Sequence, residues 1–296
     1  MPLESIDHLM RGCREGGYAV GYFESWNLES LQGVLDAAEQ TQSPIIIGFN
    51  GEFLSHAGRR APERLAIYAA MGKAAAEAST VPCGLIFNEC SSDQWVLKAA
   101  EAGFNLVMPA DPDCSYDEYK RRVQRIVHHC HERHVAVEAE LGELPCGASG
   151  RVQGSSQLTD PVLAEQFVKE TGVDLLAVSA GNVHIQMDGQ QDLDLERLAA
   201  IHDRLRIHLV LHGGTGISAS SLREAIRLGV AKVNYGTYLK QRYLAAVRVT
   251  LAQEQTNPHE ILGIGGKSDV MIAARLAVRD AVLERIEALG CCGRAW

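Results

Sequence analysis

Two histidines and one glutamate stand at positions where they could share a single ion. His184 and His212 each follow a short apolar segment, and Glu89 ends another. Two neutral imidazoles and a carboxylate make a suitable site for a divalent transition metal that keeps open coordination positions. We therefore predict that Glu89, His184 and His212 bind a metal ion. Glu138 and Glu140 are predicted as a further ligand or as a partner that orients a histidine.

Glycine-rich turns next to His212 could bind an anion. The apolar run Leu209–Leu211 leads to His212, and Gly213, Gly214 and Thr215 follow at once. Backbone N–H groups at such a strand-to-helix turn suit a phosphate group. A similar turn, Asn234–Thr237, precedes another predicted helix. A hydrogen-bonded histidine in an ordinary tight turn is the alternative interpretation of the first stretch.

The elements that must position these residues alternate regularly along the chain. Eight short apolar segments predict strands, and helical patterns separate them. The predicted strands are 19–23, 44–49, 83–87, 105–108, 135–139, 174–179, 207–211 and 231–234. Eight such units favour a closed (β/α)8 barrel, an α/β fold in which functional groups gather at the carboxyl ends of the strands. We expect one domain over residues 1–296, with extra helices at about 237–253 and 268–289.

A doubly wound open sheet is the alternative architecture. That fold usually carries a dinucleotide-binding glycine pattern after its first strand, and Gly21–Glu24 does not show one. The barrel is therefore preferred.

Composition narrows the classes of partner. The chain has 296 residues, is 46% hydrophobic and carries a formal charge of -9 without a basic tract, so we expect no nucleic-acid partner. No apolar run reaches the roughly 18 residues of a membrane span, and Met1–Cys13 lacks the apolar centre of a signal peptide. Eight cysteines without a C-x-x-C pair are typical of reduced thiols in the cytoplasm.

Several ordered motifs resemble the class II, metal-dependent fructose-bisphosphate and tagatose-bisphosphate aldolases. The resemblance extends from about Gly16 to Ala295. It implies the same barrel, a homodimer or homotetramer, and a phosphorylated sugar substrate. It also implies a divalent metal, with Zn²⁺ as the first choice and Mn²⁺, Mg²⁺ or Co²⁺ as alternatives. The motifs are Val137–Gly142, Leu158–Pro161, Thr171–Asp174, Leu209–Gly216 and Gly229–Asn234.

The resemblance assigns roles to residues at the ends of strands six, seven and eight. The metal-binding histidines of the family fall on His184 and His212. The substrate and its phosphate would contact residues of the turns that follow the same strands. These predicted contacts are Gly181, Ile185, Gly213, Gly214, Thr215, Asn234, Tyr235, Gly236 and Thr237.

Three positions depart from the family pattern. Asn88 and Glu89 stand where the family has an aspartate that donates a proton and a histidine that binds the metal. Ile185 replaces a glycine that contacts phosphate, and Glu24 replaces a frequent asparagine. Because an amide cannot transfer a proton as a carboxyl group does, Asn88 needs a substitute. Glu24, Glu140 and Glu143 are the candidates.

These residues predict a divergent aldolase. It would cleave a phosphorylated ketose, or a related sugar acid, to a dihydroxyacetone-phosphate-like product and an aldehyde. Two alternatives remain open. One is an epimerase or isomerase that uses a metal-stabilised enediolate, and the other is a non-catalytic protein that binds sugar phosphates.

Overall fold

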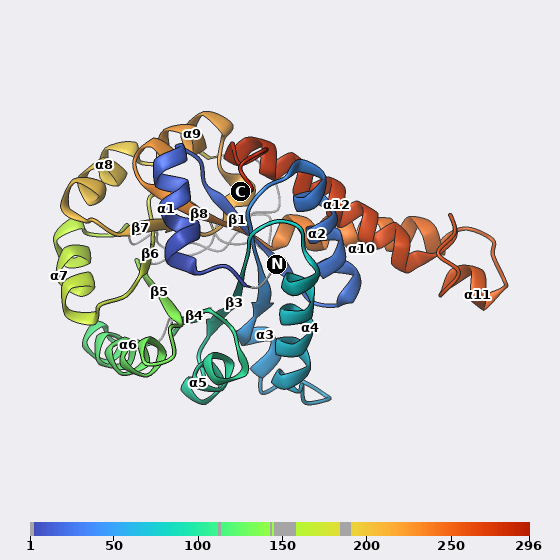
Figure 1. Ribbon diagram of the computed structural model, residues 1–296, viewed down its shortest axis with the longest axis horizontal. Coiled ribbons are helices and arrows are strands. Elements are labelled where there is room, and N and C mark those ends of the chain that lie inside the picture. Colours follow the sequence, from blue (N-terminus) through green and yellow to red (C-terminus); the bar gives the residue numbers. More distant parts are fainter. Residues whose placement is uncertain (1–2, 112–113, 143, 145–157, 184–190) are drawn as a thin grey trace.

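Eight parallel strands close into a barrel in chain order, and β1 pairs with both β2 and β8. The computed structural model describes residues 3–111, 114–142, 144, 158–183 and 191–296. The predicted (β/α)8 fold is confirmed, and the open sheet is excluded (Figure 1). The strands are β1 (Val20–Ser25), β2 (Ile45–Asn50), β3 (Cys83–Cys90), β4 (Leu106–Pro109), β5 (Ala136–Leu141), β6 (Leu175–Val178), β7 (His208–Leu211) and β8 (Val230–Tyr235).

The helices surround the barrel because the strands are parallel, and a helix between two strands returns the chain to the end of the barrel where the next strand begins. The predicted helices are present, with ends that differ by a few residues. They are α2 (Leu28–Thr41), α4 (Leu65–Ala78), α5 (Asp93–Ala102), α6 (Tyr116–His131), α7 (Pro161–Thr171), α8 (Leu195–Arg204), α9 (Ala219–Arg227), α10 (Thr237–Leu251) and α12 (Val270–Leu289). Two short helices, α3 (Gly51–Ser55) and α11 (Pro258–Ile261), were not predicted.

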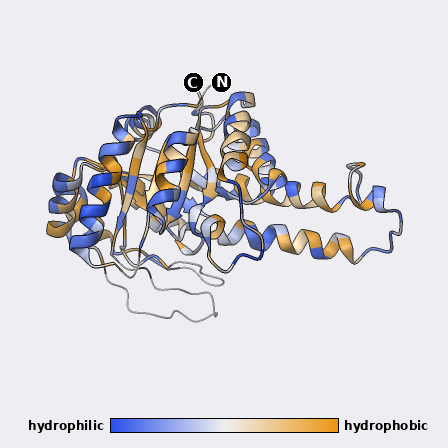
Figure 2. Ribbon diagram, turned by 90° about the horizontal axis from the view of Figure 1, so that it is seen from below, coloured by the Kyte–Doolittle hydropathy of each residue, from blue (hydrophilic) through white to orange (hydrophobic). Residues whose placement is uncertain are grey.

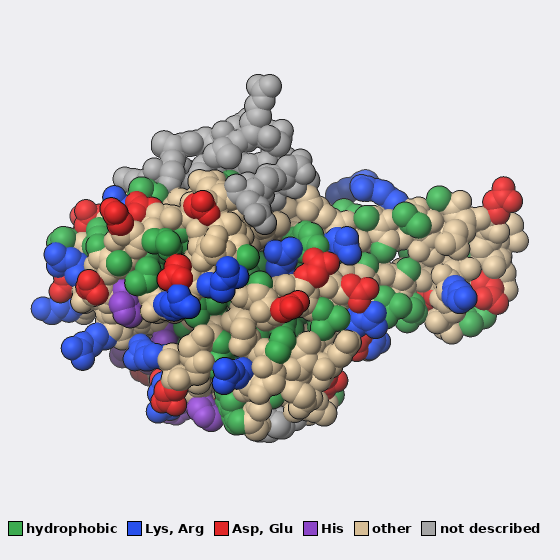
Figure 3. Space-filling view, turned by 90° about the horizontal axis from the view of Figure 1, so that it is seen from above, with side chains coloured by type: hydrophobic (Ala, Val, Ile, Leu, Met, Phe, Trp, Pro, Cys, Tyr) green, Lys and Arg blue, Asp and Glu red, His purple; other side chains and the backbone are tan. Residues whose placement is uncertain are grey.

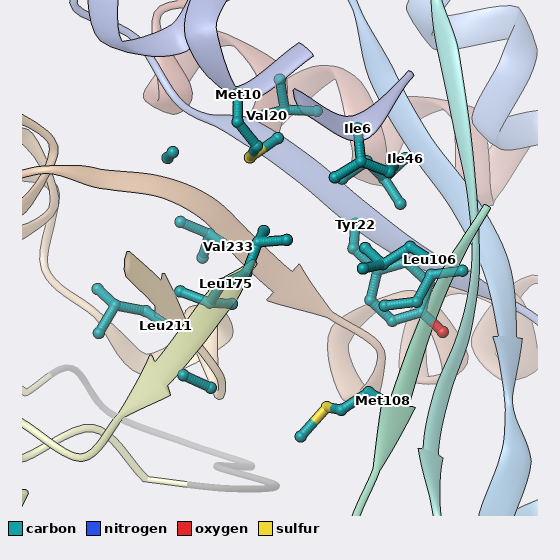
Figure 4. Packing of buried hydrophobic residues seen from close by; sticks show 14 of the residues in the cluster. Ile6, Met10, Val20, Tyr22, Ile46, Leu106, Met108, Leu175, Leu211 and Val233 are labelled. Atoms are coloured by element: carbon teal, nitrogen blue, oxygen red, sulfur yellow. The ribbon is translucent and has the colours of Figure 1, made fainter. Parts of the chain in front are cut away.

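The amino-terminal helix α1 (Ile6–Gly16) was also missed. Ser5 caps it by accepting a hydrogen bond from the backbone N–H of His8, and Ile6, Leu9, Met10 and Cys13 form its buried stripe. This spacing is a helical period that the sequence does contain. Figure 4 shows Ile6 and Met10 beside Val20 and Ile46, so α1 covers the amino end of the barrel.

The strands divide their side chains between the barrel interior and the layer beneath the helices. On β8, Lys232 and Asn234 alternate with Val233 and Tyr235. The Tyr235 ring stacks on Phe23 at 5.3 Å between ring centroids, which places it in the apolar layer. The alternate residues of β8 therefore face the interior, where the polar groups of the site lie.

Helices α10, α11 and α12 form an arm that extends away from the barrel (Figures 1 and 2). Arg275 on α12 makes a bidentate ion pair with Asp36 on α2, at 2.6 Å for both N–O distances. This pair fixes the end of the arm that is next to the barrel.

Among the described helices, none is long and apolar enough to cross a membrane, and the seven described cysteines are free thiols.

Gly48 on β2 allows the backbone of β3 to approach closely. A Cβ atom at this position would lie 2.0 Å from the carbonyl oxygen of Ile86, a backbone atom that cannot move aside. We expect Gly48→Ala to lower the free energy of unfolding by about 3 kcal/mol, measured by urea denaturation. Gly266→Ala is the matched control because its nearest neighbouring atom would be 3.9 Å away. Equal stability of the two variants would contradict this account of strand packing.

Candidate functional site

His212 follows β7 directly, and a buried carboxylate fixes its ring. The side chain is 2% exposed, and its Nε2 lies 3.1 Å from Oε1 of Glu138 on β5. The amide of Asn182 donates to the His212 carbonyl oxygen at 2.9 Å, so the backbone is held as well. A carboxylate that accepts from one ring nitrogen fixes the orientation of the ring and directs the other nitrogen toward a position where a bound cation could replace its proton.

The second ring nitrogen of His212 faces two further carboxylates. Its Nδ1 lies 3.3 Å from Oε1 of Glu89 and 3.6 Å from Oε1 of Glu140. Burial alone favours the neutral ring, but Glu140, Glu138 and Glu89 raise the pKa of His212 to about 9. The three carboxylates therefore create a strongly cation-attracting position at Nδ1.

Lys232 compensates the buried charge of Glu138. Its Nζ lies 2.8 Å from Oε2 of Glu138, and both side chains are fully buried. Lys232 also donates to Oδ1 of Asn234 at 2.6 Å. Burial raises the pKa of Glu138, but the nearby charges of Lys232 and His212 outweigh it and lower that pKa. Lys232, Glu138 and His212 thus form one line of charged groups inside the barrel.

Glu89 adopts a backbone conformation that is unusual for glutamate. Its φ is 50°, in the left-handed region, and its Oε2 accepts a hydrogen bond from the Asn50 amide at 2.8 Å. Arg122 on α6 holds the next turn by donating to the carbonyl oxygens of Cys90 at 3.1 Å and Ser91 at 2.8 Å. Such conformations persist only where neighbouring contacts enforce them, and they concentrate at functional sites.

Glu89 and Glu140 also line a pocket of about 800 Å³ at the carboxyl ends of β3, β4 and β5. This size is within the range of small-molecule sites.

Nearby strand ends carry buried polar atoms for which the described residues offer no hydrogen-bond partner. These atoms are Ser25 Oγ, Asn88 Oδ1 and Asn234 Nδ2. Since buried polar atoms are rarely left unpaired, they indicate contacts to a ligand or to water.

The two glycine turns follow adjacent strands, as predicted. Gly213 has a φ of 65°, and Gly214–Gly216 forms a short 3₁₀ turn. Gly236 caps α10, which begins at Thr237. Gly181, after β6, has a φ of 88°. Both turns thus place their backbone at the start of a helical segment. The predicted substrate contact Tyr235 differs from this expectation, because its side chain points into the apolar layer and stacks on Phe23.

Glu24 lies against the second turn. A Cβ atom at Gly236 would be 2.3 Å from its Oε2, and its Oε1 pairs with Lys240 at 2.6 Å. The carboxylate of Glu24 is therefore close to the predicted phosphate contacts but is already neutralised by a lysine.

Three predicted site residues, Glu143, His184 and Ile185, lie outside the described residues. Within the described ranges, no group of three or more His, Cys, Asp or Glu side chains meets the arrangement of a metal centre. Two of the three predicted ligands, Glu89 and His212, are described, and their separation is compatible with a shared ion. Two ligands of one tetrahedral ion, each about 2.0–2.1 Å from it, lie about 3.3–3.4 Å apart. The separation of 3.3 Å between Glu89 and His212 matches that value.

Sequence reasoning did not assign roles to Lys232, Asn50, Arg122 or Lys240. Lys232 could have been found, because it alternates with Asn234 on the inward face of β8. Arg122 could not, because its partners Cys90, Ser91 and Ala110 belong to other segments.

Removal of Lys232 should expose the energetic cost of the buried carboxylate. We expect Lys232→Met to lower the free energy of unfolding by about 3–5 kcal/mol in urea titrations, because Glu138 would keep its charge without its cation. The double variant Lys232→Met/Glu138→Leu should recover most of this loss. Lys169→Met, on the exposed face of α7, serves as the control. A single variant as stable as this control would disprove the charge network.

Comparisons with known proteins identify the family of the chain. The family described as fructose-bisphosphate aldolase class-II matches residues 4–294. A protein named probable fructose-bisphosphate aldolase from Bacillus subtilis (strain 168) is 32% identical, with all of both chains covered. The fructose-bisphosphate aldolase of Geobacillus stearothermophilus is 34% identical, with 100% of this chain and 99% of the other covered.

Solved structures give the same result for the fold. The YdjI aldolase from Escherichia coli K12 superposes with a TM-score of 0.81 and 31% identity, over 99% of this chain and 100% of the other. A fructose-bisphosphate aldolase from Campylobacter jejuni shares the fold at a TM-score of 0.78 and 20% identity, over 99% and 97% of the two chains. The chain described here belongs to the class II fructose-bisphosphate aldolase family, whose members are lyases.

Proposed function

We propose that this protein is a divalent-metal-dependent aldolase that cleaves a phosphorylated ketose or a related sugar acid. The products would be a dihydroxyacetone-phosphate-like compound and an aldehyde. The observation that carries the proposal is the placement of His212 Nδ1 between Glu89 and Glu140, with Glu138 on the opposite ring nitrogen. The glycine turns after β7 and β8 lie beside it.

Glu89, His184 and His212 would hold the metal ion, with Zn²⁺ as the first choice. When bound, a divalent cation polarises the substrate carbonyl and stabilises the enediolate that cleavage produces. Glu138 accepts a hydrogen bond from Nε2–H of His212 and so keeps Nδ1 directed toward the site. A carboxylate ligand adds negative charge compared with a third histidine, so Mn²⁺ or Mg²⁺ is a reasonable alternative.

Of the two candidates for proton transfer that the structure describes, Glu140 is better placed than Glu24. It lines the pocket, and its side chain is 24% exposed. It would remove the proton from the hydroxyl group next to the scissile carbon–carbon bond, and the bonding electrons would pass to the carbonyl group. Glu24 is less suitable because Lys240 already binds its carboxylate. The Asn88 amide would donate a hydrogen bond to substrate oxygen rather than a proton.

Gly213, Gly214 and Thr215, together with Asn234 to Thr237, would bind the phosphate group of the substrate. This proposal rests on the backbone of two adjacent turns that each open a helical segment. The loops after strands seven and eight serve this purpose in many barrels of this type.

The direct test is a cleavage assay on a panel of ketose mono- and bisphosphates, with released dihydroxyacetone phosphate measured by a coupled reduction. We expect activity on at least one member, loss of that activity with a chelator, and recovery after metal is restored.

Glu140→Gln should lower kcat by a factor of about 100 to 10,000. Glu287→Gln, on an exposed position of α12, should match the parent enzyme.

Two further variants separate the possible failures. Glu89→Ala should bind less metal, and full metal content in this variant would remove Glu89 from the site. Asn88→Asp should gain cleavage of ordinary ketose bisphosphates because a carboxyl group returns. If the panel gives no cleavage but epimerised or isomerised substrate accumulates, the enediolate chemistry stands and the aldol step does not. Substrate binding without any turnover would support the non-catalytic alternative.

We also propose that the arm formed by α10, α11 and α12 mediates a homodimer or homotetramer. Large apolar side chains are exposed along it, including Val249 at 68%, Ile264 at 59% and Leu251 at 58% (Figure 3). Exposed apolar surface of this kind is typical of contacts between subunits, and a second copy of the chain supplies a complementary apolar surface under two-fold symmetry.

Light scattering on the purified protein tests this assembly. We expect the mass of a dimer or a tetramer, and we expect Val249→Asp/Leu251→Asp to shift the mass toward the monomer. Val162→Asp, at a comparably exposed position on α7, should leave it unchanged. A monomeric parent protein at micromolar concentration would contradict the proposal.

A further inference from the structure

A second pocket lies at the amino end of the barrel, opposite the candidate active site. It has a volume of about 500 Å³. Its walls come from the end of α1, the connection from α8 to β7 and the connection from α9 to β8. We call it the basal pocket. Neither of the glycine turns contributes to it, and neither do Glu89 and His212, the candidate metal ligands that the structure describes, so it is separate from the site described above.

The basal pocket carries positive charge in an acidic protein. Three arginines, Arg14, Arg206 and Arg227, line it, and Asp203 is the one carboxylate among the described residues of its wall. Arg227 pairs with Glu224 at 2.5 Å. Within the described part of the chain, neither Arg14 nor Arg206 forms an ion pair. The whole chain has a formal charge of -9, so two uncompensated guanidinium groups at one pocket are unusual.

Two histidines complete the polar wall, and the ring of one of them packs against a glycine. The ring of His202 packs over Gly229 so closely that a Cβ atom there would be 2.5 Å from Nδ1. His208 begins β7 and is half-buried. Burial, together with the nearby charge of Arg14, lowers the pKa of His208 to about 4. Its ring is therefore neutral at pH 7 and can donate a hydrogen bond.

Apolar residues line the remainder of the pocket. Ile207, Ile226 and Val230 contribute to the wall beside the arginines. A pocket of about 500 Å³ is larger than a bare phosphate ion needs and is within the range of small organic ligands. Guanidinium groups bind phosphate through paired, charge-assisted hydrogen bonds, and the apolar wall suits a short carbon chain.

We propose that the basal pocket binds a small organic phosphate ester, with Arg14 and Arg206 as its cationic contacts. The phosphate group binds the two guanidinium groups, His202 and His208 contribute ring N–H donors, and the carbon chain lies on the apolar wall. The ligand contacts His208 at the amino end of β7. His208 stands four residues before His212, which is about 13 Å along the strand. The assignment is independent of the reaction proposed above.

Histidine ring NMR tests this site without interference from the candidate active site. The ring signals of His202 and His208, assigned with His202→Gln and His208→Gln, are followed while glycerol 3-phosphate is added to the full-length protein. We expect both signals to shift and to saturate. Arg14→Gln/Arg206→Gln should weaken binding about tenfold or more, because both charged contacts are lost. Since both arginines are exposed, the fold should be unaffected.

Arg223→Gln is the matched control, because Arg223 is exposed on α9 but does not line the pocket. It should bind glycerol 3-phosphate as the parent does. Inorganic phosphate should bind more weakly than the ester, and equal affinity would overturn the assignment to an organic ligand. The proposal is wrong if neither ring signal shifts, or if the double variant and the parent bind the ester equally.

Discussion

A buried ion pair between Lys232 and Glu138 is the interaction on which the candidate site depends. Two charges inside a barrel are costly to remove from water, and their attraction offsets that cost only when the geometry is good and the remaining lone pairs are used. Here the 2.8 Å contact to Lys232 leaves Oε1 of Glu138 available for His212 at 3.1 Å. The pair thus converts a buried carboxylate into a fixed acceptor that determines the orientation of the imidazole.

The barrel makes this arrangement possible because strands far apart in the sequence end at one rim. Glu89 comes from β3, Glu138 and Glu140 from β5, and His212 from the end of β7. The left-handed backbone at Glu89 and the hydrogen bond from Asn50 direct its carboxylate toward His212. Three acidic groups around one histidine would repel one another without a cation, so the arrangement itself favours binding of positive charge.

Much of this organisation could be predicted from the order of residues. The eight strands, the position of His212 at the end of the seventh and its proximity to Glu89 follow from apolar periodicity and from the way parallel barrels gather strand ends. The sequence leaves the pairing of Glu138 with His212 open as one of two roles, and only the three-dimensional structure brings the two side chains together. The same holds for Arg122, whose partners are carbonyl groups of other segments, and for the left-handed φ of Glu89, which tertiary contacts impose on a residue that does not favour it. Helix α1 was not predicted, although its buried residues Ile6, Leu9, Met10 and Cys13 follow a helical period that is present in the sequence.

We propose that Glu138 holds Nε2 of His212 and that Nδ1 faces the metal ion when one is bound. Histidine ¹⁵N NMR of protein loaded with ¹¹³Cd²⁺ tests it most directly, with the His212 signals assigned by a His212→Asn variant. The account predicts a one-bond coupling between cadmium and Nδ1 of His212, while Nε2 keeps its proton. Coupling at Nε2, or no coupling to His212 in metal-loaded protein, would contradict it.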